Sequence, residues 1–243
     1  HDQSSAASDV YKRQKLFCAG VGESHPDFTN ASRAIKSSEV EKCKANGITP
    51  LEMKVGYDGI VFANSKEGAS FEVTPLELYL ALAKDIPQAD GTLKENTYTN
   101  WNEINPNFPN QKIEVLGPPP SSGTRDAWVE LVMEKGCKTF DWVKAMKKQD
   151  KKKYKGICHG IREDGAFVEA GENDNLIIQK LANNPDAFGI FGYSFLDQNT
   201  DVIKGTVIGG VAPTFESIAD GSYPASRGLY VYCLLYTSDA ADD

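Results

Sequence analysis

The stretch GPPPSSGTRDAWVELVMEKG, which runs from Gly117 to Gly136, decides the fold and the site. Three prolines lead into small hydroxyl residues and an arginine, and a helical pattern follows. Its spaced positions are Trp128, Leu131, Val132 and Lys135. This spacing predicts a helix, Gly136 predicts its C-terminal end, and the apolar run at 112–116 predicts a strand before the prolines. The hydroxyl cluster therefore falls on a turn from a strand into a helix.

The residues of this turn are suited to binding an anion. The first backbone N–H groups of a helix lack internal partners, and the helix dipole makes that end positive. Ser122 and Thr124 add hydroxyl groups, and Gly123 allows a ligand to approach the backbone. Arg125 adds a fork of donors that fits a tetrahedral oxyanion. Together these features predict an anion-binding socket. The alternative is that Ser122 or Thr124 only caps the helix and that Arg125 pairs with a nearby acid.

Both ends of the chain carry sequence that we expect to be foreign. Residues 4–14 read SSAASDVYKRQ and residues 233–243 read CLLYTSDAADD. These segments match translations of one sequencing-library adapter and of its complement. We therefore expect residues 1–14 and 233–243 to be non-native flanks, as for any fusion scar. The native part would run from Lys15 to Tyr232 and would be a fragment of a longer chain.

Composition narrows the classes of function. The 243 residues carry a formal net charge of −8, which becomes −5 when the three aspartates of the C-terminal flank are set aside. This acidity argues against a nucleic-acid partner or a membrane surface as partner. No stretch approaches the roughly 20 apolar residues of a membrane span. The native part is long enough to bury the core of one or two domains.

Four cysteines lie in the expected native part: Cys18, Cys43, Cys137 and Cys158. They lack C-x-x-C spacing, so zinc and redox motifs are not indicated. Pairing of Cys18 with Cys43 and of Cys137 with Cys158 would close two loops of moderate length. The other two pairings, and four buried free thiols, remain open alternatives.

Strand-type and helix-type segments alternate along the chain. Strands are predicted at 59–64, 112–116, 189–195 and 229–232, and further helices at 138–154 and 176–182. A helix that Thr74 and Glu77 begin with a capping box is expected to end at Pro87. The lysine-rich run KKQDKKKYK, at 147–155, is interpreted as a solvated helix face. The alternation favours an α/β fold with mostly parallel sheets.

Motifs for catalysis and metal binding are missing from the sequence. It contains no P-loop, no G-x-S-x-G elbow and no H-E-x-x-H. Ser122 has no signature of a partner base, and His25 and His159 are interpreted as structural or exposed. The acids at 163–164 and at 169 and 172 are interpreted as surface or helix-terminus charge. The sequence therefore predicts no catalytic residue, no metal and no cofactor.

A second cluster repeats the ingredients of the first. PDFTNASRAIK, at 26–36, brings a serine and an arginine together about 90 residues before the socket. Two such clusters in one α/β chain predict an anion held between two lobes. With KIEVLGPPPSSGTRDAW at 112–128, REDGAFVEAGENDN at 162–175 and FGIFGYSFLD at 188–197, the chain resembles the substrate-binding protein of bacterial phosphate ABC transporters. The resemblance covers 15–232.

The resemblance implies a periplasmic-binding-protein type II fold, an α/β fold of two lobes, truncated here in the first lobe. It implies part of lobe 1 at 15–64, lobe 2 at 65–225 and a return to lobe 1 at 226–232. The crossing strands are expected at 57–64 and 226–232. An incomplete first lobe predicts weak binding and poor solubility of the chain as given.

The resemblance also implies which residues bind phosphate. The expected ligands are Ser32, Arg33, Ser122, Gly123, Thr124 and Arg125. Many members of the family carry an aspartate after the first-lobe serine, as acceptor of the phosphate proton, where this chain has Arg33. They carry arginine and aspartate before S-G-T, where this chain has Pro118 and Pro120. Arg125 is expected to replace that arginine, and Asp126 is the candidate proton acceptor.

The implied function is capture of inorganic phosphate and its delivery to the permease subunits of an ABC transporter, without catalysis. The protein is expected to be a monomer in the periplasm or tethered outside the membrane, with its signal peptide outside this fragment. Paired cysteines would suit that oxidising compartment. The alternatives are a receptor for another tetrahedral oxyanion, such as sulfate, and a phosphate-ester hydrolase.

Overall fold

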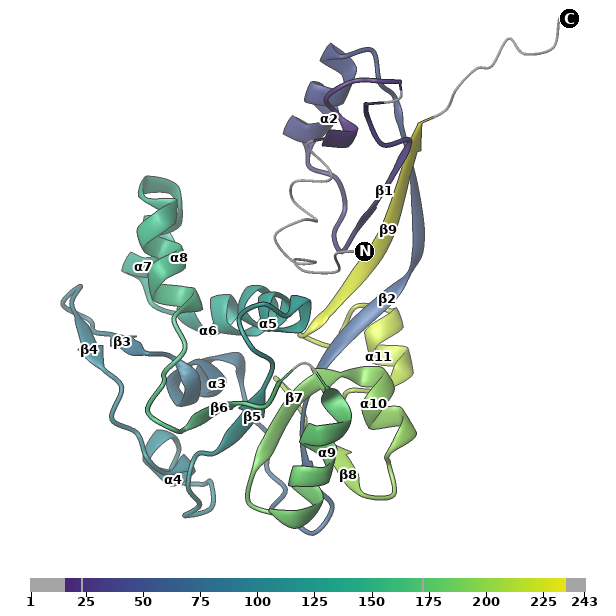
Figure 1. The fold of residues 1–243 in the computed structure, drawn as a ribbon. Helices are drawn as coiled ribbons and strands as arrows, with labels where there is room; N and C mark the ends of the chain where they lie inside the picture. The colour runs from purple at the N-terminus through teal and green to yellow at the C-terminus, as the bar shows by residue number, and fades with distance from the viewer. Residues whose placement is uncertain (1–15, 23, 172, 235–243) are drawn as a thin grey trace, which may run out of the picture. The chain divides into compact units, whose positions relative to one another are not determined.

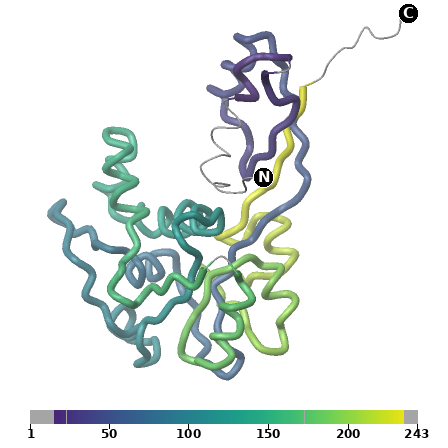
Figure 2. The backbone as a smooth tube through the Cα atoms, viewed as in Figure 1, coloured from purple at the N-terminus to yellow at the C-terminus, as the bar shows by residue number. Residues whose placement is uncertain are grey.

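The computed structural model describes residues 16–22, 24–171 and 173–234. The chain divides into unit 1, residues 1–58 and 227–243, and unit 2, residues 59–226. It passes into unit 2 within strand β2 (Pro50–Ser65) and returns at the start of strand β9 (Ser226–Leu234), as Figure 2 traces. The flank predicted at 1–14 and nearly all of the one at 233–243 lie outside the described residues.

Unit 1 is built on strand β1 (Phe28–Ala31), β9 and the first part of β2. β1 pairs antiparallel with β9, and β9 also neighbours β2. Helix α2 (Ser37–Ala45) contributes to a small buried core. That core comprises Phe17, Cys18, Ala31, Cys43, Ile48 and Tyr232. Cys18 and Cys43 form a disulfide, one of the pairings that the sequence left open.

The sheet of unit 2 runs in the order β2, β7 (Phe188–Gly192), β5 (Val115–Gly117) and β6 (Phe167–Glu169), and β8 (Ile203–Gly205) also pairs with β2. β5 is parallel to both of its neighbours, whereas β2 is antiparallel to β7 and β8. The sheet is therefore mixed, and the expectation of mostly parallel strands is wrong. β2 belongs to both units, so its direction is not set by a helical crossover within unit 2.

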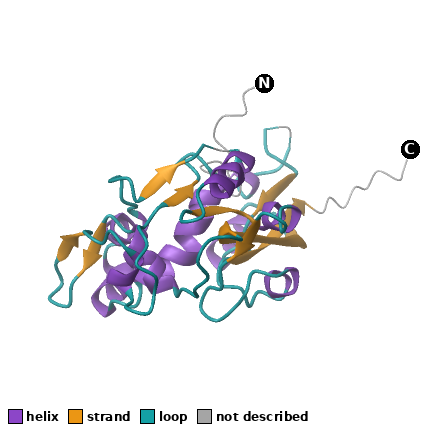
Figure 3. Ribbon diagram, turned by 90° about the horizontal axis from the view of Figure 1, so that it is seen from below, coloured by secondary structure: helices purple, strands orange, loops and turns teal. Residues whose placement is uncertain are grey.

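Helices pack around this sheet, and Figure 3 shows the mixture of helices and strands. They are α3 (Pro75–Leu82), α4 (Trp101–Ile104), α5 (Gly123–Trp128), the π-helical turn η1 (Val129–Met133), α6 (Glu134–Cys137), α7 (Asp141–Gln149), α8 (Lys151–His159), α9 (Asp174–Asn183), α10 (Tyr193–Gln198) and α11 (Phe215–Ala219). A separate hairpin joins β3 (Asp85–Pro87) to β4 (Leu93–Glu95). In the core the rings of Phe62 and Phe188 stack with centroids 4.6 Å apart.

The start of α3 confirms the predicted capping box. Thr74 Oγ1 accepts the Glu77 N–H at 3.2 Å, and Glu77 Oε2 accepts the Thr74 N–H at 2.7 Å. The helix ends at Leu82, however, and the expectation that it runs to Pro87 is wrong. The side-chain amide of Asn96 donates to the carbonyls of Leu80 and Ala83, and so satisfies groups that a longer helix would have bonded internally.

The sequence predicted that Gly136 ends the helix after the socket, but the helix continues past this residue. α5, η1 and α6 continue from one to the next through Cys137. A Cβ atom on Gly136 would lie 2.2 Å from the carbonyl oxygen of Pro75 and 2.6 Å from Cβ of Tyr79. The glycine therefore permits close packing of α6 on α3, and this tertiary requirement is invisible in the local sequence.

Two further expectations need correction. The single helix predicted at 138–154 is two helices, α7 and α8, because Asp150 breaks the first and its carboxylate caps the second by accepting the Lys153 N–H at 2.9 Å. The strand predicted at 189–195 ends at Gly192, which is the N-cap of α10. A disulfide between Cys137 and Cys158 ties α6 to α8, and with Cys18–Cys43 it selects one of the three pairings that the sequence left open.

Candidate functional site

The socket lies where β5 ends. β5 is flanked by parallel strands on both sides, so the turn after Gly117 leaves the carboxyl edge of the sheet, where ligands of α/β folds commonly bind. Gly117 is buried, and a Cβ there would lie 2.4 Å from Cζ of Phe167. Glycine at the end of β5 therefore makes room for the Phe167 ring, which forms part of the site.

Ser122 caps the helix that begins at Gly123. Its Oγ accepts the Thr124 N–H at 3.2 Å, which confirms the capping role proposed as the alternative to an anion socket. The two roles are compatible, because a serine hydroxyl that accepts one hydrogen bond still has a proton to donate. Ser122, Gly123 and Thr124 are all half-buried, so the turn is packed yet reachable by solvent.

Arg125 is held against strand β6. Its Nη1 donates to the carbonyl of Pro118 at 3.1 Å, and its guanidinium lies over the ring of Phe167, 4.4 Å from the centroid. The side chain is thus fixed from both sides, by the proline loop and by an aromatic face. Burial lowers the pKa of Arg125, but a guanidinium stays charged at any physiological pH.

Carboxylates surround this cation. Glu169, Glu163 and Asp126 interact electrostatically with Arg125 and partly offset the effect of burial on its pKa. Glu169 is opposite Gly117 in the β5–β6 register. It shares a face of β6 with Phe167, since side chains two residues apart on a strand point the same way. Glu163 and Glu169 are both exposed, as the sequence interpretation of surface charge expected, and their electrostatic interaction with Arg125 was not predicted.

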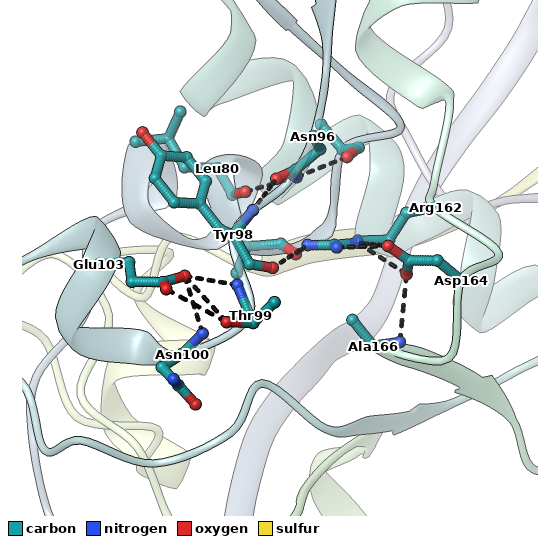
Figure 4. Close-up of polar contacts among 11 residues, drawn as sticks. Leu80, Asn96, Tyr98, Thr99, Asn100, Glu103, Arg162, Asp164 and Ala166 are labelled. Carbon is teal, nitrogen blue, oxygen red and sulfur yellow. Dashed lines mark hydrogen bonds and ion pairs between the residues drawn. The ribbon is translucent and has the colours of Figure 1, made fainter.

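A buried arginine fixes the loop that leads into β6. Arg162 is 6% exposed and donates through Nη1 to the carbonyls of Tyr98 and Ala81, at 2.8 and 3.3 Å. Its Nε donates to the Asp164 carboxylate at 2.8 Å, and the same carboxylate accepts the Ala166 N–H (Figure 4). The loop is therefore anchored immediately before Phe167.

The segment that receives Arg162 is itself hydrogen-bonded. Asn96 Oδ1 accepts the Tyr98 N–H at 3.1 Å while its amide caps α3. Glu103 accepts the N–H groups of Thr99 and Asn100 at the start of α4 (Figure 4). Hydrogen bonds thus connect α3, α4 and the loop before β6, and they fix the strand that carries the ring beneath Arg125.

The second predicted cluster lies in unit 1. Arg33 donates to the Glu39 carboxylate through both terminal nitrogens, at 2.9 and 2.7 Å, and to the Ala34 carbonyl at 3.0 Å. Glu39 also accepts the Lys36 N–H at the start of α2, so the pair ties the turn after β1 to that helix. Arg33 therefore has a structural role in unit 1.

Ser32 is half-buried directly after β1. It lines a cavity of about 470 Å³ in unit 1 together with Asn30, Val55, Tyr230 and Val231. Most of that lining is apolar, which distinguishes it from the charged surroundings of Arg125. The roles predicted for Ser32 and Arg33 in anion binding stay predictions.

The described residues contain no cluster of three or more histidine, cysteine, aspartate or glutamate side chains arranged to hold a metal ion. None of their helices is both long and apolar enough to cross a membrane.

The chain matches a known protein family over most of its length. The model of the PBP superfamily domain matches residues 12–243. The chain therefore belongs to the PBP superfamily, the class of two-lobed binding proteins that its motifs resemble. Its curated relatives include a phosphate-binding protein PstS from Staphylococcus saprophyticus, 32% identical over 85% of this chain and 54% of the relative. Protein SphX from Synechococcus elongatus is 27% identical over 90% of this chain and 55% of its own length.

The fold agrees with this placement. A crystal structure described as a possible phosphate binding protein from Planctomyces limnophilus matches with a TM-score of 0.64 and 25% identity, over 91% of this chain and 67% of the other. The resemblance to phosphate-transport binding proteins and the α/β fold predicted from the motifs are thereby confirmed. The chain spans about half the length of the curated relatives it matches.

Proposed function

We propose that the protein is an extracytoplasmic receptor that captures inorganic phosphate for an ABC importer, and that Ser122, Gly123, Thr124 and Arg125 form the unit 2 part of its binding site. One observation carries this proposal. Arg125 is fixed between the Pro118 carbonyl and the Phe167 ring, beside a helix start at the carboxyl edge of the sheet. A pre-positioned guanidinium beside helix N–H groups suits a tetrahedral dianion.

The acids around Arg125 bear on which anion is bound. Carboxylates repel a fully deprotonated anion such as sulfate, but one of them can accept a hydrogen bond from the proton of hydrogen phosphate. Asp126 remains the acceptor predicted from the sequence. Glu169 is a second candidate, because it shares a face of β6 with the ring that supports Arg125. This arrangement favours phosphate over the sulfate alternative.

The remaining parts of the proposal rest on the relatives. Ser32 and Arg33 are proposed as phosphate ligands on the strength of the family resemblance alone, and Arg33 would have to bind the anion while paired with Glu39. We assign the protein no catalysis, a monomeric state, a location outside the cytoplasmic membrane and permease subunits as partners. The names of the PstS relatives support phosphate as the ligand.

Calorimetric titration of the 243-residue chain with phosphate and sulfate, side by side, tests the assignment. We expect phosphate to bind more tightly, and Arg125→Ala to weaken that binding. Equal affinities for the two anions would contradict the proposal that phosphate is the specific ligand.

Incubation with p-nitrophenyl phosphate separates the receptor from the hydrolase alternative. A receptor gives no turnover above a buffer control. Sustained turnover that disappears in Ser122→Ala would establish a hydrolase instead.

A further inference from the structure

The α7–α8 hairpin, residues 141–159, concentrates positive charge in an acidic protein. Its lysines are Lys144, Lys147, Lys148, Lys151, Lys152, Lys153 and Lys155, and all seven are exposed. With Asp141 and Asp150 they give the hairpin a formal charge of +5, within a chain whose formal net charge is −8. The negative net charge of the whole chain therefore does not describe this surface. An anionic partner, which the net charge argued against, can still bind to the hairpin.

The hairpin is fixed to the body of unit 2. The Cys137–Cys158 disulfide joins α8 to α6, and Trp142 Nε1 donates to the Gln88 carbonyl at 2.8 Å. α7 and α8 also pack on each other, as the two neighbouring helices at one edge of unit 2 in Figure 1. The lysines are thus presented on a fixed support.

One buried acid pairs with a single lysine of the hairpin. The Glu134 side chain is 9% exposed and binds Lys147 at 3.1 Å, Tyr154 at 2.8 Å and His159 at 2.8 Å. Within the described part of the chain, Lys147 is the one hairpin lysine with an ion pair. The other six hairpin lysines have no ion pair among the described residues, so their charge can face an external partner.

The residue types indicate what that partner is. The charged side chains are all lysine, with no arginine, and the hairpin aromatics are turned inward: Tyr154 is 1% exposed and Trp142 is half-buried. Protein interfaces favour arginine and exposed aromatic residues and are depleted of lysine. Single-stranded nucleic acids need aromatic stacking platforms. A cluster of lysines alone suits a fluid anionic surface that requires no shape complementarity.

We propose that the α7–α8 hairpin binds the surface of membranes that contain anionic phospholipids. The attraction is electrostatic, without insertion of apolar side chains. Each lysine near such a surface contributes roughly fivefold to the partition coefficient. Binding falls as salt shortens the range of the attraction, which is about 10 Å at 0.1 M ionic strength. The proposal is independent of phosphate capture.

Co-sedimentation of the 243-residue chain with phosphatidylglycerol–phosphatidylcholine vesicles tests it, with pure phosphatidylcholine vesicles as control. The hairpin variant carries Lys148→Glu, Lys151→Glu and Lys152→Glu, which leave the Glu134 network intact. A matched variant with the same net charge carries Lys42→Glu, Lys44→Glu and Lys180→Glu, at exposed positions elsewhere. Thermal unfolding shows whether both variants remain folded.

We expect the unsubstituted chain to bind anionic vesicles at low salt and to dissociate at about 0.5 M salt. The hairpin variant should bind at least about a hundredfold more weakly, since three contributions of about fivefold are lost. The matched variant should lose far less of its affinity for anionic vesicles. Equal losses in both variants, equal binding to neutral vesicles, or no vesicle binding at low salt would overturn the proposal. Binding to immobilised polyglutamate without binding to vesicles would replace the lipid surface with an acidic protein.

Discussion

The guanidinium of Arg125 lies over the ring of Phe167, 4.4 Å from the ring centroid, although the two residues come from different elements. Arg125 is in the first turn of α5 and Phe167 begins β6. The contact depends on Gly117, because any larger residue at the end of β5 would occupy the space of the ring. The proposed socket therefore consists of a helix start, a cation and the aromatic support that orients it.

Arg125→Ala should weaken phosphate binding by about 1.5–3 kcal/mol, the range for hydrogen bonds to charged groups. This corresponds to a ten- to hundredfold higher dissociation constant. Arg125→Lys keeps the charge but loses the planar fork of donors. Its dissociation constant should therefore lie between those of the unsubstituted chain and Arg125→Ala. Calorimetry measures all three proteins. An unchanged dissociation constant in Arg125→Ala would reduce this residue to an internal partner of Glu169.

Phe167→Leu should weaken phosphate binding by a smaller amount. Leucine fills much of the space beside Gly117 but has no aromatic face for the guanidinium, a contact worth about 0.5–1 kcal/mol. We expect a two- to fivefold rise in the dissociation constant. Phe195→Leu, at a half-buried aromatic position in α10, is the matched control and should leave binding unchanged. Similar losses in both variants would mean that the effect is general destabilisation.

Glu169→Gln and Asp126→Asn test which acid selects the protonated anion. Removing the acceptor should narrow the preference for phosphate over sulfate, because sulfate then meets less repulsion and hydrogen phosphate loses its acceptor. The ratio of the two dissociation constants is the quantity to compare. If neither variant changes that ratio, the group that accepts the hydrogen bond from the phosphate proton is neither Glu169 nor Asp126.

The free energy of unfolding of unit 2 should depend on pH because of the Glu134 carboxyl group. Burial by itself raises the pKa of this carboxyl, but hydrogen bonds from His159, Lys138, Tyr154 and Lys147 outweigh it and hold the pKa well below the ordinary 4.5. A folded-state pKa below the unfolded value stabilises the fold above about pH 4.5, and that contribution is lost as the pH falls further. We therefore expect the free energy of unfolding to decrease progressively below about pH 4.5.

Glu134→Gln should lower the free energy of unfolding by about 2 kcal/mol at pH 7, since it removes one partner of a buried ion-pair network and keeps the shape. It should also flatten the pH dependence below 4.5. Glu130→Gln, at an exposed position in η1, is the control. Urea unfolding between pH 7 and pH 3 measures both variants. Identical acid profiles for Glu134→Gln and the unsubstituted chain would contradict this role of the carboxylate.

Local sequence patterns were sufficient for several elements. The capping box at Thr74, the helix after Asn173 and the turn at Ser122 all formed where predicted, because their hydrogen bonds close within a few residues. The turn that carries the proposed socket residues of unit 2 formed where predicted for the same reason, and their role in phosphate binding stays a prediction. The cysteine pairing, by contrast, was left open by the sequence, and the structure selects Cys18 with Cys43 and Cys137 with Cys158.

Features set by distant contacts could not be predicted. The end of α3 depends on Asn96, and the support of Arg125 depends on Phe167. Two of the three acids near Arg125 are also distant in sequence, because Glu163 lies in the loop before β6 and Glu169 lies in β6. The pairing of Arg33 with Glu39, six residues further along the chain in α2, was not predicted either. In each case the missing information was a contact and not a residue preference.

Gly136→Ala should destabilise unit 2, even though alanine is the better helix former. The helical preference favours alanine by about 1 kcal/mol. The new Cβ would, however, lie 2.2 Å from the Pro75 carbonyl oxygen and 2.6 Å from Tyr79 Cβ. Both atoms belong to the start and middle of α3 and cannot move without shifting that helix, and such overpacking costs roughly 1–3 kcal/mol or more.

We therefore expect the steric cost to win, with a net loss of roughly 1–2 kcal/mol and a melting temperature lower by several degrees. Gly156→Ala in α8 is the matched control, because nothing lies within 4 Å of the added Cβ. That variant should gain about 0.5–1 kcal/mol from the restricted unfolded chain. Thermal and urea unfolding of the three proteins gives the comparison. A Gly136→Ala variant as stable as Gly156→Ala would show that α6 and α3 do not pack at this separation in solution.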